Sequence, residues 1–170
     1  MSSSGSNRGI ACDSQGRVEI FTDGCCVRNG QPEAKAGVGG YFGHNSPLNF
    51  SEPVVGRATN NTAEIQAVTK SLNQAKSHGI SDVVIKTDSK FTIDCSTRWM
   101  DTWKSNGWTK ADGNEVVNKE DLKALDQAQQ GMTVTYEHVR GHSGNPGNER
   151  ADHLARQGAE RYEAPRRYDK

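Results

Sequence analysis

The sequence predicts an α/β domain built on a five-stranded mixed sheet of strand order 3-2-1-4-5, with helices packed against it. One observation is a change of hydrophobic period, because three short β-like segments come first and helical and β segments then alternate. The other is that two similar apolar segments, 18–24 and 83–89, each lead into an aspartate, Asp23 and Asp88. Such acids are typical of strand ends along one sheet edge.

Length, composition and charge indicate one globular domain. The chain has 170 residues, of which 32% are hydrophobic and 25% are charged. Basic and acidic residues both total 21, so the formal net charge is +0 and any contact with nucleic acid must be local. No segment approaches the roughly 20 apolar residues of a membrane span, and no secretory signal is seen. We expect a monomer in the nucleus or cytoplasm, and this N-terminus does not support mitochondrial import.

Polar composition marks both ends of the chain. Residues 1–16 are rich in serine and glycine, and we expect a disordered leader or a linker remnant there. Residues 163–170 are expected to form a flexible tail. The folded domain is therefore expected over residues 17–162.

The first part of the domain predicts an antiparallel meander. The strand at 18–24 is followed by two short β candidates at 37–44 and 48–55, which are bounded by Gly, Pro and Asn. Short connections between the three segments favour antiparallel neighbours.

The rest of the domain alternates helices with strands. A helix over 60–78, ended by Gly79, has a sheet-facing stripe that includes Glu64. The later elements are a strand over 82–87, helical pieces over 89–97 and 98–106, a helix over 119–130 with Asn118 as its N-cap, a strand over 132–139 and a last helix to about residue 162. Helical crossovers would set the two later strands parallel to the first.

Four acidic residues are expected to meet at one edge of this sheet. Asp23 and Asp88 lie at strand ends, where open α/β sheets form their reactive crevice. Glu64 lies on the buried stripe of its helix, and Asp152 lies early on the inward side of the last helix. Each acid alone could be a turn residue or a partner in a helix cap. Their joint placement favours a functional site.

Clustered carboxylates without cysteine or paired histidines favour a hard divalent cation. Mg²⁺, with Mn²⁺ as an alternative ion, prefers oxygen ligands. Two such ions about 4 Å apart can activate a water and stabilise the leaving oxygen of a phosphoryl displacement. The sequence therefore predicts a site with two ions that acts on a phosphodiester.

Ordered motifs around these acids resemble type 1 ribonuclease H, in particular the catalytic domain of the eukaryotic form. The resemblance runs from about residue 18 to 162 and rests on TDGCC at 22–26, TNNTAE at 59–64, TDS at 87–89, the tryptophan segment 99–108, GHSG at 141–144 and GNERAD at 147–152. It implies a ribonuclease H-like fold. It also implies an endonuclease that hydrolyses the RNA strand of RNA/DNA hybrids with two ions and leaves 5′-phosphate and 3′-hydroxyl ends.

The resemblance assigns the catalytic roles. It makes Asp23, Glu64, Asp88 and Asp152 the metal ligands, with Asp23 bridging both ions. His142, on the glycine-rich loop after the last strand, matches the family's auxiliary histidine. An imidazole on such a loop suits proton transfer near neutral pH.

The resemblance also implies contacts with both strands of a hybrid duplex. The RNA contacts, which must read the 2′-hydroxyl, would be Cys25, Cys26, Asn29, Asn60 and Asn61. The DNA contacts would be a phosphate pocket of Arg57, Thr59 and Asn118 and a deoxyribose channel of Phe91, Trp99 and Trp103. The cysteines could equally be small buried hydrophobes, and tryptophans at this spacing are often core anchors.

Charge near the tryptophans is mixed. Arg98, Lys104 and Lys110 resemble the family's basic protrusion, but Asp101 and Asp112 lie among them. We therefore expect modest electrostatic affinity for hybrids.

Two alternative functions remain. A nuclease of the same fold superfamily that acts on DNA would share the acids, and a non-catalytic module would bind hybrids without cleaving them. The expected 2′-hydroxyl contacts argue against the first alternative, and the presence of all four acids argues against the second.

Overall fold

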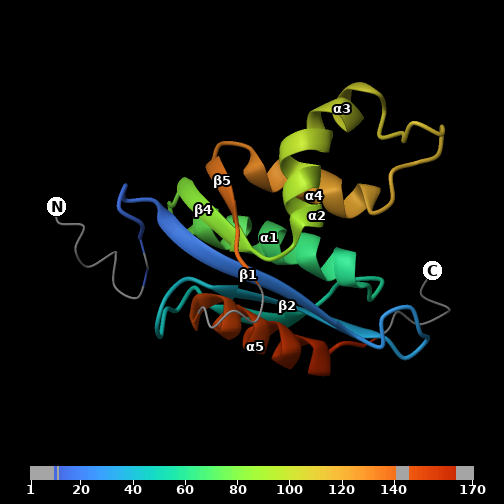
Figure 1. Cartoon of the computed structure of the whole chain (residues 1–170). Helices are drawn as coiled ribbons and strands as arrows, with labels where there is room; N and C mark the ends of the chain where they lie inside the picture. Colours follow the sequence, from blue (N-terminus) through green and yellow to red (C-terminus); the bar gives the residue numbers. More distant parts are fainter. Residues whose placement is uncertain (1–9, 11, 141–145, 164–170) are drawn as a thin grey trace.

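The strands form one five-stranded sheet of order β3-β2-β1-β4-β5 (Figure 1). The computed structural model describes residues 10, 12–140 and 146–163. The strands are β1 (Val18–Val27), β2 (Lys35–Tyr41), β3 (Phe50–Pro53), β4 (Asp82–Thr87) and β5 (Thr133–His138). The first three form an antiparallel meander, and β4 and β5 follow in parallel beyond β1. The predicted class and strand order are confirmed.

β1 continues past the end that the sequence predicted. It extends to Val27, because residues 23–27 pair with β2. Parallel pairing with β4, in contrast, stops at Phe21 and Lys86. The prediction that β1 ends at its aspartate is therefore wrong. Asp23 lies at the point where β1 has left its parallel neighbour, whereas Asp88 does follow the last residue of β4, as predicted.

The helices cover both faces of the sheet. They are α1 (Asn60–Ser77), α2 (Lys90–Asp94), α3 (Met100–Ser105), α4 (Lys119–Gln129) and α5 (Pro146–Glu160). α1 packs on β1, β2 and α4, and α5 packs against β1, β2 and β3 on the opposite face (Figure 1). No helix among the residues that the structure describes is long and apolar enough to cross a membrane.

The main hydrophobic core lies between the sheet and α1. Its largest fully buried side chains include Ile20, Ile65, Leu72, Ile85 and Leu122. On the other face, β2 admits α5 at very close range because it presents glycines. A Cβ on Gly39 would lie 2.5 Å from the carbonyl oxygen of Ala151, so only glycine allows this approach.

Two local features differ from the sequence prediction. The helical pieces α2 and α3 are joined by a π-helical turn, η2 (Cys95–Trp99), rather than by a break near residue 97. Asn118 precedes α4, as predicted, but its backbone is left-handed, with φ 66°, and its side chain makes no capping hydrogen bond. Its Oδ1 accepts instead from the hydroxyl of Thr62 in α1.

Residues just before β1 pack with the domain. Cys12 forms an antiparallel bridge with Val18, and Ile10 packs against the main core. The Asp13 carboxylate accepts from the backbone N–H of Arg17 at 2.9 Å and from its Nε at 2.7 Å. These contacts lie ahead of residue 17, where the sequence placed the start of the domain.

Candidate active site

Asp23, Glu64 and Asp88 converge at the corner where β1 separates from β4. Each acid offers one carboxylate oxygen, and the three oxygens lie within 4.8 Å of one another. Asp23 comes from β1, Glu64 from α1 and Asp88 from the residue after β4. Three separate elements thus deliver three like charges to one point, as the sequence predicted.

Gly24 allows α1 to approach β1 and orients Glu64. A Cβ at this position would lie 2.4 Å from the carbonyl carbon of Ala63, which is closer than real contacts allow. The backbone N–H of Gly24 donates to Oε1 of Glu64 at 3.1 Å. The glycine that follows Asp23 therefore brings the second acid into place.

Burial and mutual repulsion make Asp23 and Glu64 hard to ionise. Desolvation, and then the charges of Glu64 and Asp88, raise the pKa of Asp23 to about 9. Desolvation, and then the charge of Asp88, raise the pKa of Glu64 to about 8, although the N–H of Gly24 opposes this rise. Three carboxylate oxygens with no sulfur or nitrogen donor among them fit a hard divalent cation.

Asp152 lies on α5 beside the cluster. The side chain of Asp152 contributes to the raised pKa of Asp23, so it lies near that carboxyl group. Asp152 also accepts a hydrogen bond from Nε of Arg156 at 2.9 Å, one helical turn later. It does not belong to the group of three whose oxygens lie within 4.8 Å. The structure thus places the fourth predicted acid at the margin of the cluster, and His142 lies outside the described residues.

The predicted RNA contacts lie along the end of β1 and the start of α1. Cys25 and Cys26 are free thiols of intermediate burial, and desolvation raises the pKa of both, so they stay protonated at neutral pH. Oδ1 of Asn29 accepts from the backbone N–H of Asn60 at 3.0 Å, which ties the β1–β2 turn to α1. Asn61 is exposed next to it.

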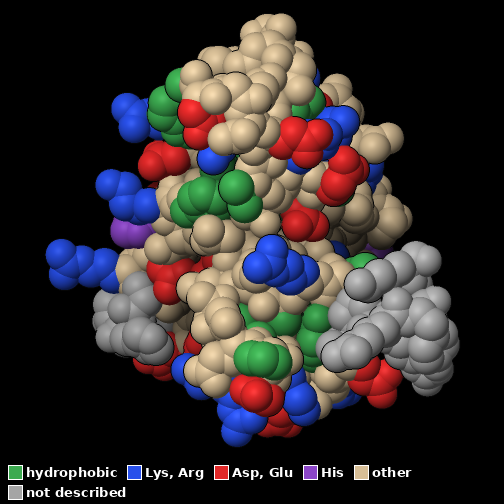
Figure 2. Space-filling view, turned by 90° about the vertical axis from the view of Figure 1, so that its right-hand side faces the viewer, with side chains coloured by type: hydrophobic (Ala, Val, Ile, Leu, Met, Phe, Trp, Pro, Cys, Tyr) green, Lys and Arg blue, Asp and Glu red, His purple; other side chains and the backbone are tan. Residues whose placement is uncertain are grey.

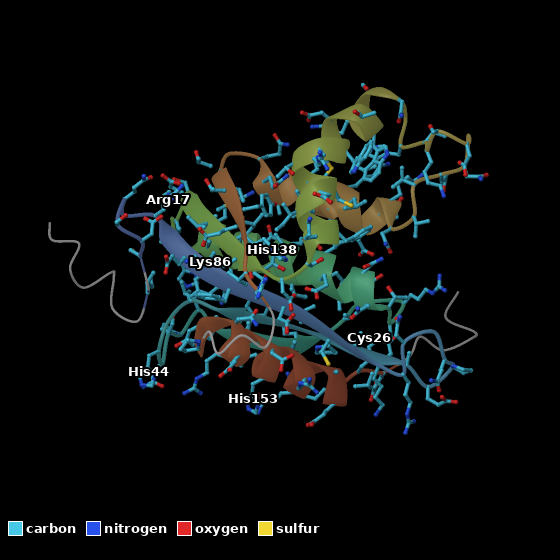
Figure 3. The ribbon with its side chains drawn as sticks, in the orientation of Figure 1. Arg17, Cys26, His44, Lys86, His138 and His153 are labelled. Carbon is cyan, nitrogen blue, oxygen red and sulfur yellow. The ribbon has the colours of Figure 1, made fainter. Side chains whose placement is uncertain are left out.

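Figure 3 shows the two sides of this region. Cys26 lies on the part of β1 that extends beyond its parallel neighbours, whereas His153 projects outward from α5, away from the sheet. His153 therefore lies on the outer side of α5 and not beside β1.

The predicted DNA-phosphate pocket contains a chain of hydroxyl groups. Thr59 Oγ1 accepts from the backbone N–H of Thr62 as the N-cap of α1, and it donates to Oγ1 of Thr62 at 2.8 Å. Thr62 Oγ1 donates in turn to Oδ1 of Asn118 at 3.2 Å. The hydroxyl hydrogen of Thr59 is therefore directed at Thr62. Arg57 is exposed just before this helix start.

The predicted deoxyribose channel is an exposed aromatic stack. Trp99 and Trp103 are stacked with ring centroids 6.2 Å apart, and Trp103 contacts Trp108 at 6.4 Å. Trp99 is 49% exposed and Phe91 is 38% exposed. Trp103 and Trp108 also pack with the main core, so the stack has a buried base and an open end.

Acids offset much of the charge around this stack. Lys104 pairs with Asp126 at 3.2 Å, and Lys110 lies 3.9 Å from Asp112. Acidic and basic side chains are interspersed around the exposed hydrophobic atoms on this side of the molecule (Figure 2). The predicted basic protrusion is thus partly neutralised.

A family model described as RNase H matches residues 15–160. The chain belongs to the RNase H family. It is 49% identical over 146 residues to Ribonuclease H1 of Rattus norvegicus and of Homo sapiens, with 86% of this chain and 51% of each relative covered. It thus spans about half the length of these relatives. It is also 39% identical to Ribonuclease H of Rhizobium meliloti (strain 1021), with 89% of this chain and 96% of that protein covered.

Solved structures agree with this assignment. LC9-RNase H1, which is described as a type 1 RNase H with the type 2 active-site motif, matches with a TM-score of 0.69 and 28% identity over 85% of this chain and 72% of that chain. The RNase H domain of PFV matches with a TM-score of 0.67 and 26% identity over 84% and 93%. The resemblance to type 1 ribonuclease H is confirmed.

Sequence reasoning missed two residues that organise the site of this RNase H family member. Thr62 is 4% exposed and connects Thr59 to Asn118. Gln66 connects α1 to two other segments. Thr62 could have been found as a polar residue on the buried stripe of α1, but the partners of Gln66 depend on tertiary contacts that no local pattern reveals.

Proposed function

We propose that this chain is an endoribonuclease that hydrolyses the RNA strand of RNA/DNA hybrids and leaves 5′-phosphate and 3′-hydroxyl ends. The observation that carries the proposal is the convergence of three carboxylates within 4.8 Å in a chain of the RNase H family. Buried like charges destabilise a fold unless a cation compensates them. The cluster is therefore better explained by ion binding than by stability.

Asp23, Glu64, Asp88 and Asp152 are the proposed ligands of two divalent ions, either Mg²⁺ or Mn²⁺. When bound, these ions would offset the carboxylate charge, polarise the scissile phosphate and lower the pKa of a water nucleophile. The chain contributes the alignment of its own acids. The N–H of Gly24 holds Glu64, and the guanidinium of Arg156 holds Asp152. His142 is proposed to carry a proton during the reaction or product release.

The two sides of the site are proposed to hold different strands. The RNA strand would follow the end of β1, where the 2′-hydroxyl distinguishes RNA from DNA. The residues proposed for this side are Cys25, Cys26, Asn29, Asn60 and Asn61. The DNA strand would follow the pocket and the aromatic stack, and the residues proposed there are Arg57, Thr59, Phe91, Trp99, Trp103 and Asn118. We retain the expectations of a monomer and of a nuclear or cytoplasmic location as predictions.

Cleavage of labelled duplexes tests the proposal. A hybrid, a DNA duplex and an RNA duplex of one sequence would be incubated with and without Mg²⁺ or Mn²⁺, with each strand labelled in turn. We expect cleavage of the RNA strand of the hybrid alone, and only with a divalent ion. Cleavage of the DNA duplex would support the DNA-acting alternative. Binding of the hybrid without cleavage in either ion would support the non-catalytic alternative.

A further inference from the structure

Gln66 connects three segments of the chain through one amide group. Its Oε1 accepts from the backbone N–H of Val55 at 3.0 Å, and its Nε2 donates to the carbonyl of the same residue at 2.8 Å. Nε2 also donates to Oδ1 of Asp121, in the first turn of α4, at 3.0 Å. The side chain thus binds the segment that follows β3 and the start of α4 from its place on α1.

Each segment that Gln66 holds carries a residue of the proposed DNA-phosphate pocket. Val55 precedes Arg57 by two residues, and Asp121 follows Asn118 by three. Val55 itself is 70% exposed, and its peptide groups are held by Gln66, whereas its neighbours are held by other elements. The N–H of Val54 donates to the carbonyl of Ala36 at 2.9 Å, and the hydroxyl of Tyr162 donates to the carbonyl of Gly56 at 2.5 Å. The two hydrogen bonds from Gln66 fix the peptide groups of Val55 and so restrict the segment that leads to Arg57.

A second connection lies inside the pocket. The hydroxyl chain from Thr59 through Thr62 ends on Oδ1 of Asn118. Because Oδ1 accepts this bond, the Nδ2 group of Asn118 is oriented as a donor, and it has no hydrogen-bond partner among the described residues. Thr62 thus connects Thr59 to Asn118, whereas Gln66 connects the segment before Arg57 to the first turn of α4.

We propose that Gln66 is a positioning residue for recognition of a phosphate of the DNA strand. It ties the segment before Arg57 and the Asn118 end of α4 to one side chain of α1, and it does not touch the substrate itself. This inference rests on the proposed function. Glutamine suits the role because a single planar amide can accept from an N–H and donate to a carbonyl of one residue.

Steady-state cleavage by Gln66→Ala tests the proposal. We expect KM for the hybrid to rise about fivefold to twentyfold, as the loss of one or two positioning hydrogen bonds predicts, with kcat within about twofold of wild type. The matched control is Gln74→Ala, because Gln74 lies on the same helix and binds the carbonyl of Leu48 at 3.1 Å, away from the pocket. Gln66→Met removes the same hydrogen bonds but keeps the side-chain volume, so it is expected to raise KM as Gln66→Ala does. It provides the test if alanine impairs folding.

A substrate with a neutralised phosphate separates positioning from general stability. Hybrids would carry one methylphosphonate, placed in turn at each position of the DNA strand. For wild type, the modification at one position is expected to raise KM. The same modification should not raise KM for either Gln66 variant, because the pocket of the variants no longer holds that phosphate. An equal rise at that position in wild type and variants would overturn the inference while leaving the proposed function intact. Absence of hybrid cleavage by wild type would overturn both.

Discussion

The carboxylate cluster and the phosphate pocket both lie around the start of α1. The cluster consists of acidic groups, whereas the hydrogen-bonded groups of the pocket are neutral. Glu64 serves the cluster and Thr62 serves the pocket, and residues two apart lie on different sides of a helix. In the cluster, like charges are buried together and the pKa values of Asp23 and Glu64 rise. In the pocket, neutral hydroxyl and amide groups bind one another in sequence. Burial of carboxyl groups is costly in the cluster, whereas hydrogen bonds already satisfy the polar groups of the pocket.

The comparison predicts its largest effect for Asp23→Asn and Asp88→Asn. Each variant should lower cleavage by at least about a thousandfold, because the ions supply most of the barrier reduction. Each metal-free variant should be as stable as wild type or more stable, because it no longer has to bury or protonate one carboxyl group of a crowded cluster. Cleavage rates and thermal melts in a chelator measure both effects. Asp82→Asn, at the exposed other end of β4, is the control, and clear destabilisation of both active-site variants would contradict the clustering.

A pH dependence of stability should appear in the metal-free protein. The pKa values of Asp23 and Glu64 in the fold, about 9 and about 8, exceed their ordinary values of 3.8 and 4.5. The folded state therefore binds more protons than the unfolded state between these limits, so the free energy of unfolding falls as pH rises from about 4 to about 9. Melts across this range should show the decline, and Mg²⁺ should reduce it. If the free energy of unfolding without metal did not change with pH, the pKa values of Asp23 and Glu64 would not be raised in the fold.

The aromatic stack should give a smaller effect than the acids. Trp99→Ala removes the open face of the stack, so KM should rise about tenfold, as loss of one stacking contact with a nucleotide predicts, with little change in kcat. Steady-state kinetics measure this change. Val117→Ala, which shortens another exposed hydrophobic side chain, is the control. An unchanged KM would exclude Trp99 from substrate contact.

Salt should have the smallest effect. Lys104 and Lys110 already lie near acids, and the formal net charge is +0. The plot of log binding constant against log salt concentration should therefore be shallow. Binding of a hybrid between about 50 and 200 mM salt measures the slope. A slope that corresponds to more than about six neutralised phosphate charges would contradict the neutral character of this face.

The sequence predicted the sheet order and the meeting of three acids, because strand ends and helical stripes are local patterns. It predicted that a strand ends just before Asp88, and β4 does end at Thr87. It placed Asp23 at a strand end that does not exist, because the pairing of residues 23–27 with β2 depends on a hairpin whose length the local pattern does not fix. The acid nevertheless lies at the corner, since the parallel pairing stops at Phe21.

Features that depend on tertiary contacts could not be predicted in the same way. Asn118 was expected to cap α4, but its side chain binds Thr62 across the space between two helices. The π-helical turn before α3 ends at Trp99, and no residue pattern distinguished it from an ordinary helix. The role proposed for Gln66 emerged only from the positions of its two partner residues, Val55 and Asp121. The sequence predicted the helices and strands, but it did not predict these contacts between them.

We infer that Asp23, Glu64 and Asp88 form one carboxylate site that a divalent ion completes. Carboxyl-carbon NMR of the metal-free protein across pH, repeated with Mg²⁺, tests it most directly. We expect the carboxyl groups of Asp23 and Glu64 to titrate far above their ordinary range, near the values of about 9 and about 8, and to ionise at much lower pH when Mg²⁺ is added. Titration of both groups near pH 4 without metal, with no response to Mg²⁺, would contradict the account.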